Sequence, residues 1–523
     1  QIIEYRKKVN PVISDGIDDD SLFQRQKARR SIVIGGGLIL VAATVFAFLS
    51  SNELEKQFSS LAQDKEFSIE TDVKSGNVVV NDLAENNIDK EVRPNEPGKE
   101  SDNIDNTTEQ DTAEVNIAQN EVNKEEKTKA ESDPQKEARE VPNMMKTSPN
   151  YPNFRGIGGI GISTKKNIPI DWDGASGKNV IWKTPLPLPG QNSPIIWGDK
   201  LFFTGAEEGK QEIYCLNKNT GKLLWTTSVG GSDKVPTPIG ETGFAAPTAV
   251  TDGNFVYAIF ATGDMAAVDM NGKVIWQKDF GLPDNHYGHS SSLMIANGNV
   301  IVQWDQRNEQ KLMALASHTG DVVWSVDRDV KISWASPIVV NTGSNLEIMT
   351  AADPFVISYD AYTGKELWRM ECIGGEVGPS LAYANGIVYS VNDYSVLSAV
   401  KIGKKPTLLW ENDDHLSDIP SPVATDKYLF MATSYGVFIC YDAVTGEKYW
   451  EYEIGSNIFA SPMIVDGRVY VLDVPGIMHI IEPDKELKII SEPSLGEYSG
   501  STPIFTDGRI YLKGIKNIYC IGK

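Results

Sequence analysis

The chain has 523 residues, and its 71 acidic and 49 basic side chains give a formal net charge of -22. This length exceeds one ordinary hydrophobic core, so several segments are expected. The acidic excess, without a basic stripe, excludes a nucleic-acid-binding surface and fits a soluble, self-repelling one.

The first predicted element is a transmembrane helix at residues 31–51. The stretch SIVIGGGLILVAATVFAFLS is uncharged, and its length of about 20 residues matches a hydrocarbon core of about 30 Å. Basic residues precede it, and Glu53 and Glu55 follow it. The positive-inside rule therefore places residues 1–30 in the cytoplasm and the rest outside it, as a single-pass protein of the inner membrane. A cleaved signal peptide is the alternative, but no small-x-small cleavage site follows the span.

Residues 52–150 are predicted to be an acidic disordered linker. After Phe67 no aromatic residue occurs until Tyr151, and the interval is rich in Glu, Asp, Asn, Lys and Thr. Such a composition cannot bury enough apolar surface to offset chain entropy. The linker is either a leash that extends the distal domain from the membrane or a spacer of no selected length.

Repeats dominate residues 151–523 and predict an all-β, eight-bladed β-propeller with four-stranded antiparallel blades. Each repeat has short alternating strands, and several have a turn such as NKNTGKLLW or DAVTGEKYW before a tryptophan. Seven opening motifs pair a small residue with proline, and an eighth near Ser290–Ser292 lacks the proline. The predicted docking tryptophans of the outer strands are Trp182, Trp225, Trp276, Trp324, Trp368, Trp410 and Trp450.

The two ends of the repeat region are expected to complete one blade. The last unit ends without an outer tryptophan strand, whereas NVIWKTP at residues 179–185 is an outer strand with no unit before it. Joining them closes the ring and removes free sheet edges. The seventh unit departs from the pattern because its outer strand, KELKIISEP, has no tryptophan.

The four cysteines are predicted to be structural. No CxxC pair is present, which excludes a disulfide framework and a structural zinc site. Cys215, Cys440 and Cys520 share one third-strand position that other repeats fill with Ala or Ser, so this position is tightly packed. Cys372 lies outside this pattern and has no assigned role.

These repeats resemble the quinoprotein, or PQQ-like, β-propeller family, whose outer tryptophan docks against a glycine turn of the neighbouring blade. The YPNFRG lead-in at residues 151–156 is similar to the WPxFRG of exported bacterial members. The resemblance implies one of two activities. One branch contains PQQ- and Ca²⁺-dependent dehydrogenases, and the other contains the BamB superfamily of outer-membrane assembly factors.

Enzymatic motifs are not evident. The adjacent cysteine pair and long insertions of alcohol-oxidising relatives are missing, and no catalytic residue is assigned. Polar residues do concentrate in loops that should share one funnel-shaped face, where they could hold a ligand or simply satisfy turn backbones. The candidates are His286, His289, Gln303, Asp305, Trp334, Asp353 and Glu376, with Asp284, Gln306, Asp393, Tyr394, Asp473, Glu497 and Tyr498 on the same face.

The sequence therefore favours a non-enzymatic, membrane-anchored scaffold whose partners are envelope proteins or an envelope polymer. No cofactor or metal is expected under this hypothesis. Two alternatives remain: an oxidoreductase using PQQ and Ca²⁺, and the extracytoplasmic sensor of a receptor or kinase whose upstream part precedes Gln1.

Overall fold

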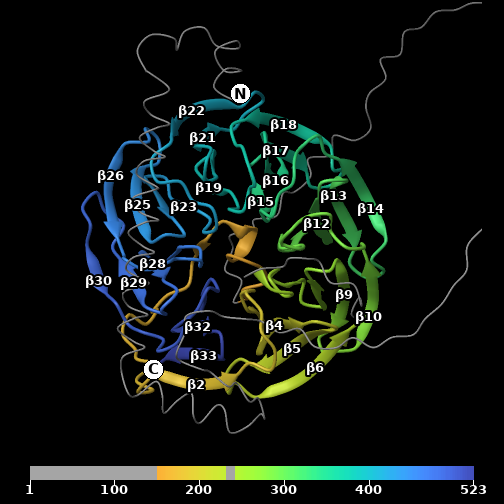
Figure 1. The fold of residues 1–523 in the computed structure, drawn as a ribbon, viewed down its shortest axis with the longest axis vertical. Helices are drawn as coiled ribbons and strands as arrows, with labels where there is room; N and C mark the ends of the chain where they lie inside the picture. Colours follow the sequence, from red (N-terminus) through yellow and green to blue (C-terminus); the bar gives the residue numbers. More distant parts are fainter. Residues whose placement is uncertain (1–149, 231–241) are drawn as a thin grey trace, which may run out of the picture. The chain divides into compact units, whose positions relative to one another are not determined.

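The computed structural model describes residues 150–230 and 242–523, which form an eight-bladed β-propeller (Figure 1). Each blade has four antiparallel strands, with the first at the centre and the fourth at the rim, and in blade 7 the short segment Ile162–Ser163 adds a fifth, parallel strand at the inner edge. The predicted fold is therefore confirmed. The predicted tail, membrane helix and nearly all of the linker lie outside the described residues. Within the described ranges, no helix is both long and apolar enough to span a bilayer.

The strands follow in chain order around the ring, and a 3₁₀ turn, η3 (Ile157–Gly159), precedes them with the short β1 (Ile162–Ser163). Blades 1 to 4 comprise β3 (Ile195–Trp197), β4 (Lys200–Glu207), β5 (Lys210–Asn217), β6 (Leu223–Val229); β7 (Val250–Thr251), β8 (Phe255–Ile259), β9 (Asp264–Asp269), β10 (Val274–Asp279); β11 (Met294–Ala296), β12 (Asn299–Asp305), β13 (Gln310–Ala316), β14 (Val322–Asp327); β15 (Ile338–Asn341), β16 (Leu346–Ala352), β17 (Phe355–Asp360), β18 (Glu366–Glu371). Blades 5 to 8 comprise β19 (Ala382–Ala384), β20 (Ile387–Val391), β21 (Leu397–Lys401), β22 (Thr407–Asn412); β23 (Val423–Ala424), β24 (Tyr428–Ala432), β25 (Val437–Asp442), β26 (Lys448–Glu453); β27 (Met463–Val465), β28 (Arg468–Leu472), β29 (Met478–Ile481), β30 (Ile489–Ser491); β31 (Ile504–Thr506), β32 (Arg509–Lys513), β33 (Asn517–Gly522), β2 (Val180–Pro185).

Each outer tryptophan lies directly opposite a small residue on the third strand of its own blade. The pairs are Cys215–Trp225, Ala267–Trp276, Ala314–Trp324, Ser358–Trp368, Ala399–Trp410, Cys440–Trp450 and Cys520–Trp182. Blade 7 inverts the arrangement, because Ile480 lies opposite Ser491 there. The paired third-strand and outer-strand side chains therefore fill the same space. A large residue on the outer strand requires a small residue on the third strand, and a large third-strand residue requires a small outer one.

This pairing predicts that Ala399→Ile destabilises blade 5 by about 1–3 kcal/mol, because the added atoms compete with Trp410 for filled space. Urea unfolding of the single variant measures this cost. The double variant Ala399→Ile/Trp410→Ser copies the arrangement of blade 7 and should cost less than the two single changes added together. Strict additivity would contradict the shared-volume explanation.

Most tryptophans also dock onto the next blade. The indole Nε1 of Trp182 donates to the carbonyl of Lys218 (3.0 Å), and that of Trp276 donates to Ser317 (2.9 Å). The glycine of the receiving turn is required, since a Cβ at Gly221 would lie 2.6 Å from the Trp182 ring. Trp368 differs, because its indole Nε1 donates to Glu347 of its own blade (3.2 Å). The next blade, blade 5, has an IGKKP turn in place of the TG turn that receives the other tryptophans.

A ring of hydroxyl groups links the inner strands. In each of seven successive junctions, a backbone N–H donates to the Ser or Thr hydroxyl of the following blade over 2.8–3.0 Å. The members in order are Ser193, Thr248, Ser292, Ser336, Ser380, Ser421, Ser461 and Thr502. In blades 2 and 5 the ring members are Thr248 and Ser380, which directly follow the proline. The small residues of the sequence motifs Ala246-Pro247 and Gly378-Pro379 therefore lie two residues before the hydroxyl-bearing residue of the ring.

The segment from Tyr151 to Lys166 crosses the centre of the ring (Figure 1). It bonds to the inner edges of blades 1, 2, 7 and 8 through the pairs Tyr151–Ile196, Pro152–Thr251, Gly161–Ile464 and Lys166–Gly508. Arg155 is fully buried and donates to the carbonyls of Leu381 (3.1 Å) and Pro422 in blades 5 and 6. This segment satisfies edge groups that would otherwise stay unpaired in the channel.

The ring closes as predicted, because β2 pairs antiparallel with β33 and completes blade 8. In Figure 1 the strand β2 lies beside the C-terminus. Lys513 strengthens this junction, since its buried Nζ donates to the carbonyls of Asn192 (3.1 Å) and Gly190 in the loop before blade 1. Burial lowers the pKa of Lys513 to about 7.

Candidate functional site

One face of the propeller, the upper face, is formed by the loops between the second and third strands and by the loops that lead to the next blade. Many exposed large apolar side chains of the described residues lie in these loops, whereas the opposite, lower face has Val444 in its turns. The members on the upper face are Leu282, Tyr287, Tyr394, Ile419, Tyr435, Tyr498 and Ile515. Concentrated exposed aromatic residues mark interaction surfaces more often than scattered ones do.

The Trp334 cluster, formed by His286, Tyr287 and Trp334, lies on this face between blades 3 and 4. The ring centroids of Tyr287 and Trp334 are 5.2 Å apart with an edge-on geometry, and His286 lies 4.7 Å from Tyr287. The indole Nε1 of Trp334 donates to the carbonyl of Gly288 (3.2 Å). This bond fixes the ring while leaving it partly exposed, as suits a preorganised contact residue.

Charged groups surround the Trp334 cluster. His286 Nε2 lies 3.1 Å from a Glu376 carboxylate oxygen, and its Nδ1 lies 2.5 Å from the Arg307 guanidinium. Arg307 is also 3.8 Å from Asp284. These four side chains come from three loops that are distant in sequence, so the fold assembles a polar rim around an aromatic centre.

The remaining sequence candidates lie beneath this surface. His289, Gln303, Asp305 and Asp353 are buried, with exposed fractions of 1–6%. Gln303 and Asp305 occupy alternate positions of β12 and point to the interface between blades 3 and 4, whereas the intervening Trp304 packs in the core between blades 2 and 3. The seven main funnel candidates therefore form two layers: His286, Trp334 and Glu376 reach the surface, and His289, Gln303, Asp305 and Asp353 lie beneath it.

Asp305 is the centre of the buried layer. Its carboxylate accepts bonds from Arg328 (2.6 Å) and Gln303 (2.8 Å), and Arg328 also donates to Thr350 of blade 4 (2.9 Å). Both ion-pair side chains are wholly inaccessible to solvent. Burial raises the pKa of Asp305 to about 6, although Arg328 and Gln303 oppose this shift.

His289 and Asp353 are likewise occupied by structural contacts. His289 stacks on Trp304 at 5.1 Å between ring centroids, and burial lowers its pKa to about 4, so it is neutral at pH 7. Asp353 accepts bonds from Lys331 (3.1 Å) and from the backbone of Gly375 (2.7 Å). Neither residue is arranged as a catalytic acid or base facing an open site.

Other sequence candidates are dispersed around the upper face. Gln306 is buried and accepts a bond from Asn285 (2.6 Å), while Asp473 bonds to Ser456 (2.7 Å) and lies 3.4 Å from His479. Glu497 caps the backbone of Asn517 (3.0 Å). Tyr498 is exposed on blade 8, away from the Trp334 cluster in blades 3 and 4.

Sequence reasoning missed Tyr435 and the group next to it. Tyr435 is exposed in the β24–β25 loop, and its hydroxyl lies 3.4 Å from His415 Nδ1. The sequence signal was weak, because ATSYGV at 432–437 shares only its Tyr and its final Val with VNDYSV at 391–396, which contains the candidate Tyr394. Only the strand register shows that these two loops are equivalent.

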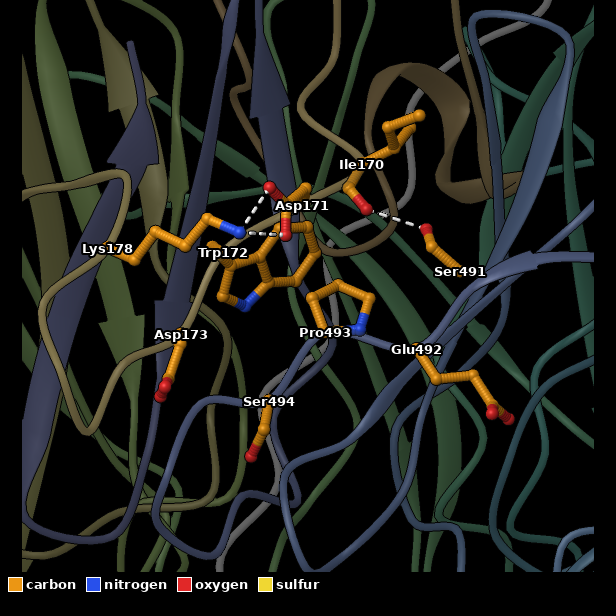
Figure 2. A pocket seen from close by; sticks show the side chains of 9 residues that line it. All are labelled: Ile170, Asp171, Trp172, Asp173, Lys178, Ser491, Glu492, Pro493 and Ser494. Carbon is orange, nitrogen blue, oxygen red and sulfur yellow. Dashed lines mark hydrogen bonds and ion pairs between the residues drawn. The ribbon is translucent and has the colours of Figure 1, made fainter.

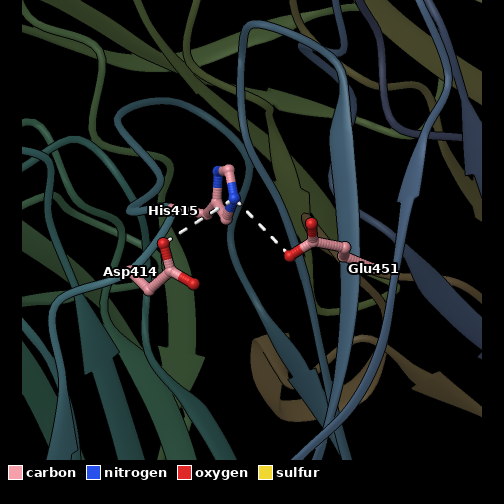
Figure 3. A group of neighbouring side chains, drawn as sticks. All are labelled: Asp414, His415 and Glu451. Atoms are coloured by element: carbon pink, nitrogen blue, oxygen red, sulfur yellow. Dashed lines mark ion pairs between the residues drawn. The ribbon is translucent and has the colours of Figure 1, made fainter. Parts of the chain in front are cut away.

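His415 also belongs to a group with metal-ligand chemistry (Figure 3). Its Nε2 lies 3.7 Å from Asp414 and 3.5 Å from Glu451, with ligand atoms within 4.8 Å of one another. However, the Lys448 ammonium bridges the same two carboxylates at 2.9 and 2.6 Å. The carboxylates therefore already have a cationic partner, which argues against a divalent ion at this position.

A Ca²⁺ and PQQ site does not fit the described residues of the funnel. Calcium requires several oxygen ligands, commonly carboxylates, but Asp305 is committed to Arg328 and Asp353 to Lys331. The cysteines offer no redox pair either, since all four are free and buried. Burial raises the pKa of Cys215 to about 12 and that of Cys520 to about 11, which keeps both thiols protonated.

A shallow pocket of about 420 Å³ lies at the rim, where blade 7 lacks its tryptophan (Figure 2). Trp172 fills the space beneath it and is 2% exposed in the core cluster that includes Leu495 and Ile480. Its neighbours Asp171 and Lys178 form an ion pair at 2.6 Å, and the Ser491 hydroxyl donates to Ile170 (2.6 Å). The segment before the first blade thus supplies Trp172 to the core beside blade 7, whose own outer strand has no tryptophan.

The chain matches one family model and two characterised relatives among known proteins. The family model described as outer membrane protein assembly factor BamB matches residues 161–303, 209–353, 308–418 and 404–487, which together cover more than half of the chain. BamB of Yersinia pestis is 24% identical over 316 residues, covering 56% of this chain and 76% of that relative. Tetrathionate hydrolase of Acidithiobacillus ferrooxidans is 26% identical over 296 residues, covering 50% of this chain, which spans only 53% of that relative.

Two solved structures share the architecture. BamB from Moraxella catarrhalis superposes with a TM-score of 0.51 at 13% identity, covering 66% of this chain and 97% of that one. The quinohemoprotein alcohol dehydrogenase ADHIIG from Pseudomonas putida HK5 gives a TM-score of 0.52 at 12% identity, covering 72% and 80%. At such low identity, both similarities show the fold alone.

Proposed function

The chain belongs to the repeat family described as outer membrane protein assembly factor BamB, and on that premise we propose that it is a non-enzymatic scaffold for envelope-protein assembly. The observation that carries the proposal is the concentration of exposed aromatic residues on the upper face. The proposal includes anchoring through residues 31–51 and an extracytoplasmic propeller. Envelope proteins are the proposed partners.

The Trp334 cluster has the composition of a binding hot spot. Hot spots are enriched in Trp, Tyr and Arg and are surrounded by polar groups that exclude water, and Trp334, Tyr287 and Arg307 supply all three residue types within hydrogen-bond or ring contact of His286. By contrast, the oxidoreductase alternative is supported by a shared fold only. The buried funnel carboxylates are bonded to cationic side chains.

Trp334→Ala in the full-length protein is expected to weaken partner binding at least about 30-fold, since hot-spot truncations cost 2 kcal/mol or more. The measurement is quantitative recovery of outer-membrane assembly proteins with affinity-tagged protein from the membranes of cells that express it. Val444→Ala on the lower face is the matched control and should leave recovery unchanged. Because Val444 is also an exposed apolar side chain, this control shows whether truncating any such side chain weakens partner binding.

Two results would refute the scaffold. One is equal recovery by wild type and Trp334→Ala, with the variant folded. The other is turnover of an alcohol or sugar on addition of PQQ and Ca²⁺, together with calorimetric binding of PQQ at micromolar concentration. The first result would remove the Trp334 cluster as the binding surface, and the second would move the activity to a cofactor site.

A further inference from the structure

A second aromatic group on the upper face lies between blades 5 and 6. This Tyr394 cluster consists of Asp393, Tyr394, His415, Asp418 and Tyr435. Tyr394 is 82% exposed and Tyr435 is 50% exposed. Both tyrosines occupy the same place in equivalent loops of adjacent blades, so each of these blades presents one exposed aromatic ring on the upper face.

The backbone of this cluster is held in an unfavourable conformation. Five of the eight described non-glycine residues with positive φ are Asn or Asp, which tolerate it well. Tyr394 (φ 59°) is an exception and belongs to the Tyr394 cluster, which also contains His415 (φ 52°), a residue type that is itself enriched in this conformation. A bulky aromatic residue in this conformation costs folding free energy, and an exposed ring regains little of it by burial, which points to a role outside the fold.

Carboxylates surround the aromatic rings. Asp393 directly precedes Tyr394, and Asp414 lies 3.7 Å from Nε2 of His415, whose Nδ1 is 3.4 Å from the Tyr435 hydroxyl. Burial, with the charges of these acids and of Asp418, raises the pKa of Tyr435 to about 12. Asp418 is only partly exposed, and its Oδ1 is buried without a hydrogen-bond partner. Lys448 is the cation that ion-pairs within this region, and it bonds to Asp414 and Glu451 rather than to Asp418.

We propose that the Tyr394 cluster binds a basic, extended segment of the partner protein, with a Lys or Arg side chain seated over an exposed tyrosine ring. An aromatic face attracts a cation within about 6 Å of the ring centroid, and the acids of the cluster add long-range attraction. An anionic membrane surface would be repelled by the same carboxylates, and an apolar segment would leave them desolvated without compensation. This inference rests on the proposed scaffold function and specifies the chemistry of its partner.

Site-specific photo-crosslinking in full-length protein tests the inference. Benzoylphenylalanine is placed at position 394, 435, 334 or 444, and crosslinked peptides are identified by mass spectrometry. We expect crosslinks at 394 and 435 to segments of net positive charge, with a yield that falls several-fold between 50 and 500 mM salt as the charges are screened. Asp393→Asn/Asp418→Asn should reduce the yield at 394 at least fivefold, whereas the lower-face control Asp426→Asn should not change it.

The outcomes separate the inference from the proposed function. Crosslinks at 334 with none at 394 and 435 overturn the inference and leave the scaffold in place. Crosslinks at 394 to neutral or acidic peptides, to lipid or to an envelope polymer also overturn it, as does a yield insensitive to Asp393→Asn/Asp418→Asn. Absence of crosslinks at every upper-face position contradicts both proposals.

Discussion

Trp182→Ala is expected to lower the free energy of unfolding by about 3–5 kcal/mol, the range for removing a large buried aromatic side chain. Trp182 is 9% exposed, packs in the core cluster that contains residues from both ends of the described domain, and bonds to Lys218 in blade 1. Its strand also contributes Thr184, whose hydroxyl donates to Gly221 (2.8 Å). The loss therefore affects the core of blade 8 and its junction with blade 1 together.

Urea unfolding followed by tryptophan fluorescence measures this effect, and Trp324→Ala is the matched control. Trp324 occupies the same position in blade 3, but its buried Nε1 has no hydrogen-bond partner within the described structure. Its replacement should cost less than that of Trp182 because no hydrogen bond is lost. A larger loss for Trp324→Ala would contradict the importance assigned to the closing strand.

Arg328→Met is expected to destabilise the protein by about 3–5 kcal/mol at pH 8, because it leaves the buried carboxylate of Asp305 without a cation. At pH 5 the loss should be smaller, since Asp305 then accepts a proton and avoids a buried charge. Unfolding at both pH values measures the difference. Lys331→Met is the control, and its partly exposed pair with Asp353 should be worth no more than about 1 kcal/mol.

In the wild-type protein, Asp305 should make the free energy of unfolding depend on pH. The folded-state pKa of Asp305, about 6, lies above the ordinary value of 3.8 for an unfolded chain. Between these values the folded state therefore binds more protons than the unfolded state, so this residue's contribution to stability decreases as the pH rises. Asp305→Asn should remove that dependence between pH 4 and 6, and an unchanged pH profile would show that another group causes it.

The blade count and ring closure could be predicted because they depend on local repeats. Outer tryptophans, TG turns and the orphan strand at residues 179–185 each leave a mark in the sequence. The register of the hydroxyl ring could not be read in blades 2 and 5, since the proline precedes Thr248 and Ser380 there instead of following them. The path of Arg155 was also hidden, because its partners Leu381 and Pro422 are more than 200 residues away.

The candidate site was predicted in composition better than in arrangement. Residues 303–305 are adjacent in sequence, but strand alternation directs Trp304 away from Gln303 and Asp305. Sequence also gives no sign of burial, so the buried His289 was grouped with the partly exposed His286. Tyr435 was missed because its equivalence to Tyr394 depends on strand pairing, and the positive φ of Tyr394 has no sequence signal.

The closing strand also has a consequence for the order of folding. Blade 8 needs β2 near residue 180 and β33, whose last residue is Gly522, and the central segment from Tyr151 requires inner strands up to Gly508. The chain between these contacts must be gathered before either forms, which makes their closure entropy large and their formation late. Nascent blades 1 to 7 consequently present an open ring during synthesis, and the domain reaches its native state only after its final strand has become available.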